Sequence, residues 1–411
     1  MTTLSLTLAV LILSAKILWS ADFQKGLSTY ERGDYASALR EWTPLAEQGH
    51  AYAQYSLGVM YDNGQGVPQD SKTAFKWFKL AAEHGYAKSQ YNLGLMYSKG
   101  RGVLQDVKTA VKWYRLAAEQ GYANAQGNLG VMYYEGRGVP QDYKTAVEWY
   151  RLAAEQGNAN AQRNLGLMHI NKQGVSQDYE TAVKWFRLAA EQGNASAQYN
   201  LGVIYSSGQG IPKDYETAVK WYRLAAEQGY AKSQYNLGVM YAKGRGVPKD
   251  YQTAVKSWKL AAEQGDHRAQ YYLGFMYING QGVPKDQKAA VKWYKLAAEQ
   301  GNANAQYNLG LMYVNGQGIS QAYKTAVKWF RLAAEQGTDR AQLNLGVMYD
   351  KGLGVERNHV YAHMWSKIAA ANGNKNADKI IEKIAQRMTT AELSEARKLA
   401  KECIRKNYKG C

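Results

Sequence analysis

A short motif returns every 36 residues along this chain, and that period limits the folds open to it more than any other feature. The motif Leu57-Gly58-Val59-Met60-Tyr61 begins again at Leu93, Leu129, Leu165, Leu201, Leu237, Leu273, Leu309 and Leu345. A second motif, Ala-Ala-Glu-Gln-Gly or a close variant, ends at Gly49, Gly85, Gly121, Gly157, Gly193, Gly229, Gly265, Gly301, Gly337 and Gly373. One such unit is too small to bury its own apolar face, so successive units must stack. We therefore predict a continuous tandem-repeat array.

The first half of each unit has the pattern of an amphipathic helix, here called helix A. In residues 51–63, the side chains of Gln54, Leu57 and Tyr61 are spaced three and four residues apart and share one face. The glycine-rich segment 64–68 then predicts a turn.

The second half of each unit predicts another helix, helix B. Asp70 stands at its N-cap, Ala74, Phe78 and Ala81 share its apolar face, and Gly85 follows its last turn. The capping aspartate recurs as Asp106, Asp142, Asp178, Asp214, Asp250 and Asp286. Ala322 replaces it in one unit, which should weaken that cap by about 1 kcal/mol.

A tryptophan also recurs in helix B, and its repeated position predicts a place in the core rather than at a cofactor. It is found as Trp77, Trp113, Trp149, Trp185, Trp221, Trp293 and Trp329. In one unit Ser257 takes this position and Trp258 follows it. We expect that shift of the indole to perturb the packing there.

The two ends of the array differ from the repeats. Residues 21–49 resemble a shortened first unit, residues 50–373 form nine repeats, and residues 374–411 form a helical cap. Cys403 and Cys411, the only cysteines, could close one small loop in an oxidising compartment; two unpaired thiols are the alternative.

The repeated pattern is similar to a known family. It reads Ala-x-Ala-Gln-Tyr-Asn-Leu-Gly-x-Met-Tyr, Gly-x-Gly-Val-Pro-x-Asp and Ala-Val-Lys-Trp-Tyr-x-Leu-Ala-Ala-Glu-Gln-Gly, and it resembles the Sel-one-like repeat, a relative of the tetratricopeptide repeat. The resemblance implies an all-α fold, a right-handed α-solenoid of tandem 36-residue helix-turn-helix repeats with helix A on its concave side. It also implies an adaptor or scaffold role, often in the bacterial envelope. Some secreted relatives with a disulfide in each repeat are linked to β-lactam or peptidoglycan-peptide binding, but no full repeat here contains cysteine.

The first twenty residues have a different composition from the rest. An apolar run from Leu4 to Ala15 is followed by Lys16, and it is too short for a typical membrane span. We interpret residues 1–20 as a signal peptide, with an uncleaved anchoring segment as the alternative. A signal peptide would place the chain in the periplasm or outside the cell.

No motif in the sequence predicts catalysis, a cofactor or a metal. Loops such as Gly100-Arg101-Gly102 lack the preceding strand that a phosphate-binding loop requires. His359 and His363 are four residues apart but have no obvious third ligand. No serine, cysteine or threonine lies in a recognisable nucleophile motif. We expect a protein that is not an enzyme, with no catalytic residues, cofactor or metal.

The formal charge of +17 has a regular position in the repeats. Lys72, Lys76 and Lys79 lie on the helix B face opposite the core, and equivalent cations recur in other units. This convex stripe could bind anionic lipid or a cell-wall polymer, or it could simply be a solvated face. Nucleic acid is not expected, because an exported protein rarely meets it.

By the tetratricopeptide resemblance, the face of helix A that contains position 55 lines the concave groove. The candidate ligand-binding residues on it are Tyr55, Tyr91, Gly127, Arg163, Tyr199, Tyr235, Tyr271 and Tyr307. Gly127 and Arg163 interrupt the tyrosine row, and we predict there a notch, flanked by Tyr91 and Tyr199, that binds a carboxylate. Neutral variation in one unit is the alternative.

These features favour an exported repeat scaffold that binds a protein or peptide through its tyrosine-lined groove. Two further hypotheses remain open: a hydrolase that binds β-lactams or peptidoglycan, and a structural protein held on anionic envelope surfaces.

Overall fold

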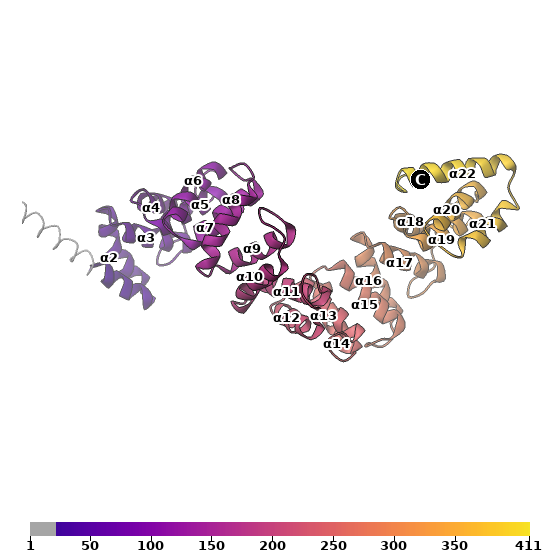
Figure 1. The fold of residues 1–411 in the computed structure, drawn as a ribbon, viewed down its shortest axis with the longest axis horizontal. Helices are drawn as coiled ribbons and strands as arrows, with labels where there is room; N and C mark the ends of the chain where they lie inside the picture. The colour runs from indigo at the N-terminus through magenta and orange to yellow at the C-terminus, as the bar shows by residue number, and fades with distance from the viewer. Residues whose placement is uncertain (1–21) are drawn as a thin grey trace, which may run out of the picture. The chain divides into compact units, whose positions relative to one another are not determined.

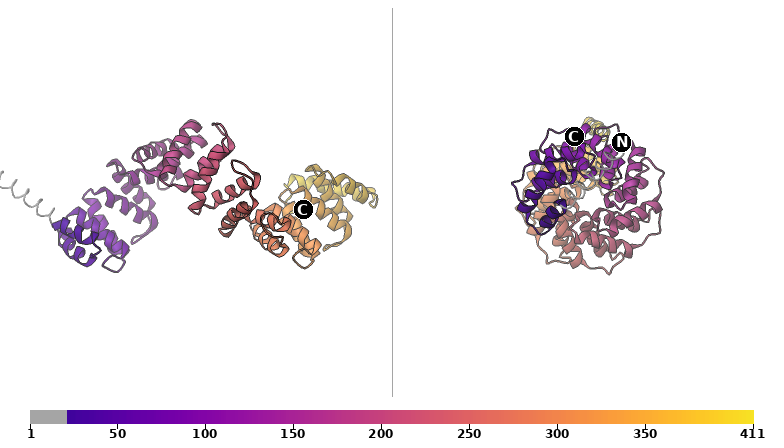
Figure 2. Two further views of the ribbon diagram at one scale, coloured as in Figure 1. Left: turned by 90° about the horizontal axis from the view of Figure 1, so that it is seen from below. Right: turned by 90° about the vertical axis from the view of Figure 1, so that its left-hand side faces the viewer.

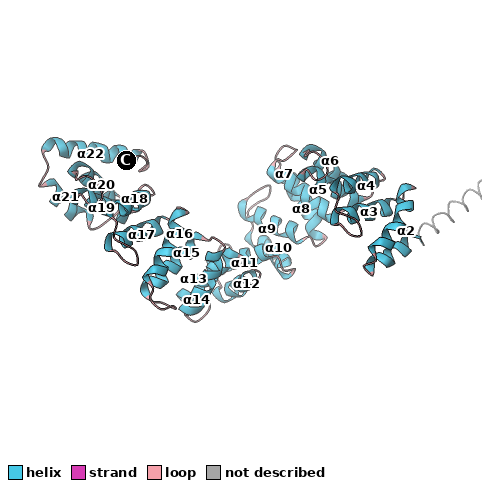
Figure 3. Ribbon diagram, turned by 180° about the vertical axis from the view of Figure 1, so that it is seen from behind, coloured by secondary structure: helices cyan, strands magenta, loops and turns pink. Residues whose placement is uncertain are grey.

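The computed structural model describes residues 22–411, and every regular element in that range is a helix (Figures 1 and 3). Helices A and B alternate along the chain in units of 36 residues, which confirms the predicted all-α repeat fold. Within the same range, no helix has both the length and the apolar character needed to cross a bilayer. The predicted signal peptide lies outside the described residues.

The helices fall into two compact units, and each is described by itself. The first contains residues 22–197 with 209–211, and the second contains residues 198–208 with 212–411. Figure 2 shows the alternating helices of each unit from two other directions.

The first unit begins with a helix over residues 22–31. It continues with α2 (Tyr35–Glu47), α3 (Ala51–Asn63), α4 (Ser71–Glu83), α5 (Ala87–Lys99), α6 (Val107–Glu119), α7 (Ala123–Glu135), α8 (Tyr143–Glu155), α9 (Ala159–Asn171) and α10 (Tyr179–Glu191). The boundary between the units falls within α11 (Ala195–Ser207).

The second unit then contains α12 (Tyr215–Glu227), α13 (Ala231–Lys243), α14 (Tyr251–Glu263), α15 (His267–Asn279), α16 (Gln287–Glu299), α17 (Ala303–Asn315), α18 (Tyr323–Ala334), α19 (Asp339–Lys351), α20 (His359–Ala371), α21 (Ala377–Ala385) and α22 (Thr390–Arg405). From α3 to α20, the odd-numbered helices are helices A and the even-numbered ones are helices B.

The helix ends are set by local side chains, as predicted. The Asp70 carboxylate accepts a hydrogen bond from the Lys72 amide at the start of α4, and the other repeated aspartates cap their helices in the same way. Ala322 makes no side-chain cap. The C-cap residue of α3 is Gly64, with a φ of +70° in the left-handed region. At the C-cap of α9 the glycine is replaced by Lys172, which has a φ of +57° in the same region. A side chain in that conformation costs roughly 1 kcal/mol.

A glycine in helix A and an aromatic ring in helix B form the centre of the first eight repeats, whereas Gly346 of the ninth faces Ser366. The ring of Phe78 lies so close to Gly58 that a Cβ there would be 2.7 Å from it. The same contact joins Gly94 to Tyr114, Gly130 to Tyr150, Gly166 to Phe186, Gly202 to Tyr222, Gly238 to Trp258, Gly274 to Tyr294 and Gly310 to Phe330. These rings are almost completely buried, so glycine is what allows the two helices to approach.

The recurring tryptophans are not core residues, and that prediction was wrong. Trp77 is only half-buried, whereas the next residue, Phe78, is 1 % exposed. The Phe78 ring packs directly against Gly58 of helix A, whereas Trp77 packs at the edge of the cluster formed by α2 and α3. Trp258 occupies this inner position, where it is buried, stacks on Tyr272 and donates to the Tyr235 carbonyl. The packing change expected from the shift of the indole from position 257 to 258 therefore consists of burying Trp258 in the core.

Buried glutamines join successive repeats. The Gln90 amide donates to the Ala82 carbonyl of the preceding helix B, and its Oε1 accepts from Gln120 at 2.7 Å. The pattern recurs in most repeats, but Gln54 Oε1 is buried and has no hydrogen-bond partner among residues 22–411. The residue equivalent to Gln120 in that repeat is His84.

The C-terminal cap closes the last repeat. Thr389 and Glu392 form the expected capping box at the start of α22. Ala396, Ala400 and Cys403 of α22 are buried against α20. A disulfide joins Cys403 to Cys411 and ties the tail to this helix.

Candidate ligand-binding site

The tyrosines of helix A pack against the next repeat. Tyr55 is half-buried, and its ring contacts Tyr86 at a centroid distance of 5.1 Å. Tyr91 contacts Tyr122 in the same way at 5.3 Å. The tyrosines of the row are therefore half-buried rather than fully exposed.

Tyr86 and Tyr122, which sequence reasoning missed, extend this aromatic surface. They stand at the N-caps of α5 and α7, where no side-chain cap is made. Burial raises the pKa of the Tyr86 phenol to about 12, so this hydroxyl remains a hydrogen-bond donor at neutral pH. The sequence signal for this contact is a spacing of 31 residues. It separates each residue of the tyrosine row from the N-cap residue of the next helix A, as Tyr55 is separated from Tyr86.

Gly127 leaves open space on this face. The residue 31 positions later, Asn158, is also smaller than the tyrosine found there in other repeats. Asn158 replaces the N-cap tyrosine and accepts a hydrogen bond from the Ala161 amide at 2.9 Å. A Cβ on Gly127 would meet only the Asn158 side chain, at 3.7 Å. The position can therefore hold a side chain without strain.

Arg163 lies on the wall of a cavity of about 210 Å³. The lining residues are Val131, Tyr134, Glu135, Tyr150, Arg163, Asn164, Leu167 and Met168, from α7, α8 and α9. The Arg163 Nε atom is buried and makes no hydrogen bond within the described residues. Arg163 therefore contributes a charged group to the lining and has one buried donor that no described group satisfies.

The surroundings of this arginine differ from the predicted notch. Neither Gly127 nor Tyr91 lines the cavity, and Tyr199 belongs to the second unit. Its polar walls are instead formed by Asn164 and by the phenol of Tyr150. Burial raises the pKa of this phenol, and the positive charge of Arg163 offsets only part of that increase.

Glu135 puts a negative charge in the lining beside the positive charge of Arg163. Its carboxylate forms an exposed ion pair with Arg137 at 3.3 Å. That pair weakens the repulsion that Glu135 exerts on an anionic ligand.

The second unit contains Tyr199, Tyr235, Tyr271 and Tyr307, together with a related cavity of about 230 Å³. Tyr307 takes the place of Arg163 in this cavity, and the Arg340 guanidinium lies 5.2 Å from its ring centroid. Asn279 replaces Glu135, and Tyr294 and Asn308 replace Tyr150 and Asn164. Each unit therefore has a helix A cavity that combines an arginine, an asparagine and a buried phenol.

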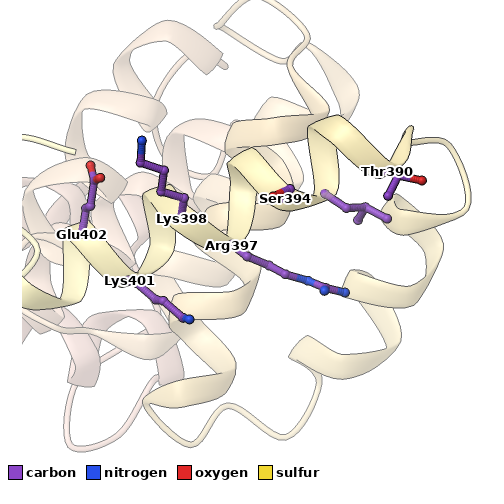
Figure 4. Close-up of a pocket in the computed structure, with 7 residues that line it drawn as sticks. Thr390, Ser394, Arg397, Lys398, Lys401 and Glu402 are labelled. Carbon is purple, nitrogen blue, oxygen red and sulfur yellow. The ribbon is translucent and has the colours of Figure 1, made fainter.

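The remaining candidates do not converge on a site. Among the described residues, no three His, Cys, Asp or Glu side chains are placed to hold a metal. His359 contacts Asp350 at 3.3 Å, and His363 is buried. A shallow hollow of about 640 Å³ runs along α22, where Lys398 and Glu402 point to one side of the helix and Arg397 and Lys401 to the other (Figure 4).

Comparison with known proteins identifies the repeat. The Sel1 repeat family matches nine consecutive segments, from residues 51–86 to residues 339–374, one residue later than the predicted boundaries. The chain belongs to the Sel1 repeat family. Proteins built from these repeats are generally scaffolds for protein interactions and typically not enzymes.

Two solved structures of Sel1-type repeat proteins are similar over most of their length. The protein c5321 of uropathogenic Escherichia coli, described as a protective antigen with an SLR fold, is 36% identical, with 95% of this chain and 93% of that chain covered and a TM-score of 0.60. A Sel1 repeat protein from Oxalobacter formigenes is 35% identical, with 75% and 90% covered and a TM-score of 0.58. A search of the curated proteins finds no match.

Proposed function

We propose that this protein is an exported scaffold whose helix A face binds a protein or peptide partner, and that the Arg163 cavity holds a carboxylate of that partner. The observation that carries the proposal is that Arg163, together with Asn164 and Tyr150, lines a cavity large enough for a side chain. A guanidinium group binds a carboxylate through two parallel hydrogen bonds, so Arg163 is the group that would hold a carboxylate in this cavity.

The polar groups around Arg163 support binding rather than catalysis. Asn164 and the neutral phenol of Tyr150 can donate further hydrogen bonds to a carboxylate. The lining contains no serine, cysteine or histidine that could act as a nucleophile or its base. We therefore do not propose the hydrolase hypothesis for this cavity.

Export rests on the apolar leader and on the similarity to c5321. That protein is described as a protective antigen, and this chain is similar to it over nearly its whole length. Amino-terminal sequencing of the native protein tests the proposal. A chain isolated from outside the cytoplasm that begins near residue 21 supports it, and an intact Met1 on a cytoplasmic chain overturns it.

Binding at the cavity can be tested by affinity capture from an envelope extract. Immobilised wild-type protein is compared with Arg163→Glu and with Lys99→Glu, a control that makes the same charge change at an exposed position of helix A. We expect a partner that the wild type and the control retain and that Arg163→Glu loses. Equal capture by all three proteins would reject the cavity as the binding site.

A further inference from the structure

The last repeat buries a histidine where the other repeats have an apolar residue. His363 of α20 is only 3 % exposed. The equivalent residue is Phe75 in the first repeat and a buried valine in the next seven: Val111, Val147, Val183, Val219, Val255, Val291 and Val327. The ninth repeat therefore contains a titratable group at a position that cannot titrate in the others.

This histidine lies in the helix that the C-terminal cap, residues 374–411, covers. Helix α20 packs against both α21 and α22 of the cap. The Nδ1 atom of His363 is buried and has no hydrogen-bond partner among the described residues. A protonated imidazole has a hydrogen to donate from each nitrogen, so a proton on His363 would place a charge and an unpaired donor in the packed interior.

The charges that act on His363 are both positive. Burial lowers the pKa of its imidazole, and Lys367 on the same helix and Arg397 on α22 lower it further. The charged residues of α21 are exposed and provide no buried counter-ion: Asp378, Lys379, Glu382 and Lys383. The closed cap therefore favours the neutral ring.

His359, one turn earlier in α20, has the opposite surroundings. Its Nδ1 atom lies 3.3 Å from the carboxylate of Asp350 in α19, which also forms an ion pair with Arg387 at 2.9 Å. Hydrogen bonds from Thr389 lower the pKa of Glu392 in α22, and the nearby His359 lowers it further. A proton on His359 would therefore be stabilised by carboxylates and would favour the closed cap.

We propose that His363 is a pH-sensitive switch that weakens docking of the C-terminal cap under mildly acidic conditions. When the cap opens, the ring enters water and takes up a proton with the ordinary pKa of histidine, about 6.5. Docking is fully stable above that value, and its stability is lost as the pH falls below it, because only the open form binds the proton readily.

Opening of the cap would expose an apolar face of the last repeat. Met364, Trp365 and Ile368 are at most 1 % exposed in the closed form. The switch would thus control access to this face in a pH range where most carboxylates stay ionised. It lies at the end of the second unit and does not depend on the proposed partner of helices A.

Hydrogen exchange of the full chain, with its disulfide intact, tests the proposal. Exchange of the α22 amides is measured near pH ~7.5 and ~5.5, and each rate is divided by that of an unstructured peptide at the same pH. We expect this protection to fall at the lower pH by up to about tenfold, the limit set by one pH unit below the ordinary pKa of histidine. Helix α13, which contains no histidine, should keep its protection.

Three variants separate His363 from the other histidines. His363→Val restores the residue of the preceding repeats and should abolish the fall in α22 protection. His267→Gln, the matched control, removes an exposed histidine of α15 and should leave the fall unchanged. His359→Gln should enlarge the fall, because it removes the group whose proton favours the closed cap.

Constant α22 protection in the wild type would overturn the proposal, as would an equal fall in His363→Val. A fall of the same size in α13 would also overturn it, since that result indicates general acid unfolding. If His363→Val does not fold, NMR titration of the His363 imidazole in the wild-type protein decides. A midpoint below about 6.5 supports the switch, and a midpoint at or above that value rejects it.

Discussion

The Gln120 side chain donates a hydrogen bond of 2.7 Å to Oε1 of Gln90, and this bond links the end of helix B to the buried glutamine of helix A. Gln90 in turn bonds to the Ala82 carbonyl of the preceding repeat. Because a buried amide must have both its donor and its acceptor satisfied, this pair defines how one repeat follows another.

The first full repeat lacks one of these bonds, which predicts a stabilising substitution. His84→Gln should supply the missing donor to Gln54 Oε1 and raise the free energy of unfolding by about 1 kcal/mol. Gln120→His is the reverse change in an intact repeat and should destabilise by a similar amount. Urea denaturation of both variants measures the effects, and a neutral or destabilising His84→Gln would contradict the role given to this bond.

Two glycines of α7 should respond in opposite ways to alanine. A Cβ on Gly130 would lie 2.6 Å from the Tyr150 ring, whereas one on Gly127 meets nothing closer than 3.7 Å. Gly130→Ala should destabilise by roughly 1–3 kcal/mol through overpacking. Gly127→Ala should stabilise by up to about 1 kcal/mol, because alanine is the better helix former. Thermal unfolding distinguishes them, and equal effects would show that the ring contact is not limiting.

The N-caps predict how stability depends on pH. The Thr145 hydroxyl and, to a smaller extent, the Thr145 backbone amide donate hydrogen bonds to the Asp142 carboxylate and hold its pKa below the usual value. The stabilisation from this cap is therefore present above the ordinary pKa of aspartate and is lost as the pH falls through the lowered one.

Asp142→Asn tests this dependence, because asparagine also caps helices but does not titrate. Melting temperatures measured from neutral to strongly acidic pH should fall less for the variant than for the wild type. Parallel curves would show that this carboxylate does not contribute to acid unfolding. Ala322→Asp provides the opposite change, since it should introduce a cap and a new acid-sensitive contribution.

The C-terminal helix should be needed for solubility. Removal of residues 389–411 exposes Met364, Trp365 and Ile368, which are now buried, and should cause aggregation and binding of an apolar dye. Removal of residues 123–158, one complete repeat, should leave the remaining repeats folded, because each contacts only its neighbours. Light scattering and circular dichroism compare the two deletions, and the reverse ranking would contradict a nearest-neighbour array.

The helices and their ends could be predicted because they depend on local sequence. The predicted helix over residues 51–63 coincides with α3, and Asp70 caps α4 as expected. The spacing of apolar residues and the hydrogen bonds of a cap act within one or two turns, so each repeat contains the information that places them.

What covers a helix face was decided only by the tertiary structure. Trp77 and Phe78 follow each other on the apolar side of helix B, yet only Phe78 meets a glycine of its own repeat. The walls of the Arg163 cavity come from three helices, and two of them contribute residues that no spacing in the sequence links to that arginine. Leu332 and Ile368 occupy the same repeat position, but one is 44 % exposed and the other fully buried, because α22 packs on only one of them. Periodicity therefore determined which residues share a face, whereas burial depended on the segment that packs against that face, which the repeat pattern does not encode.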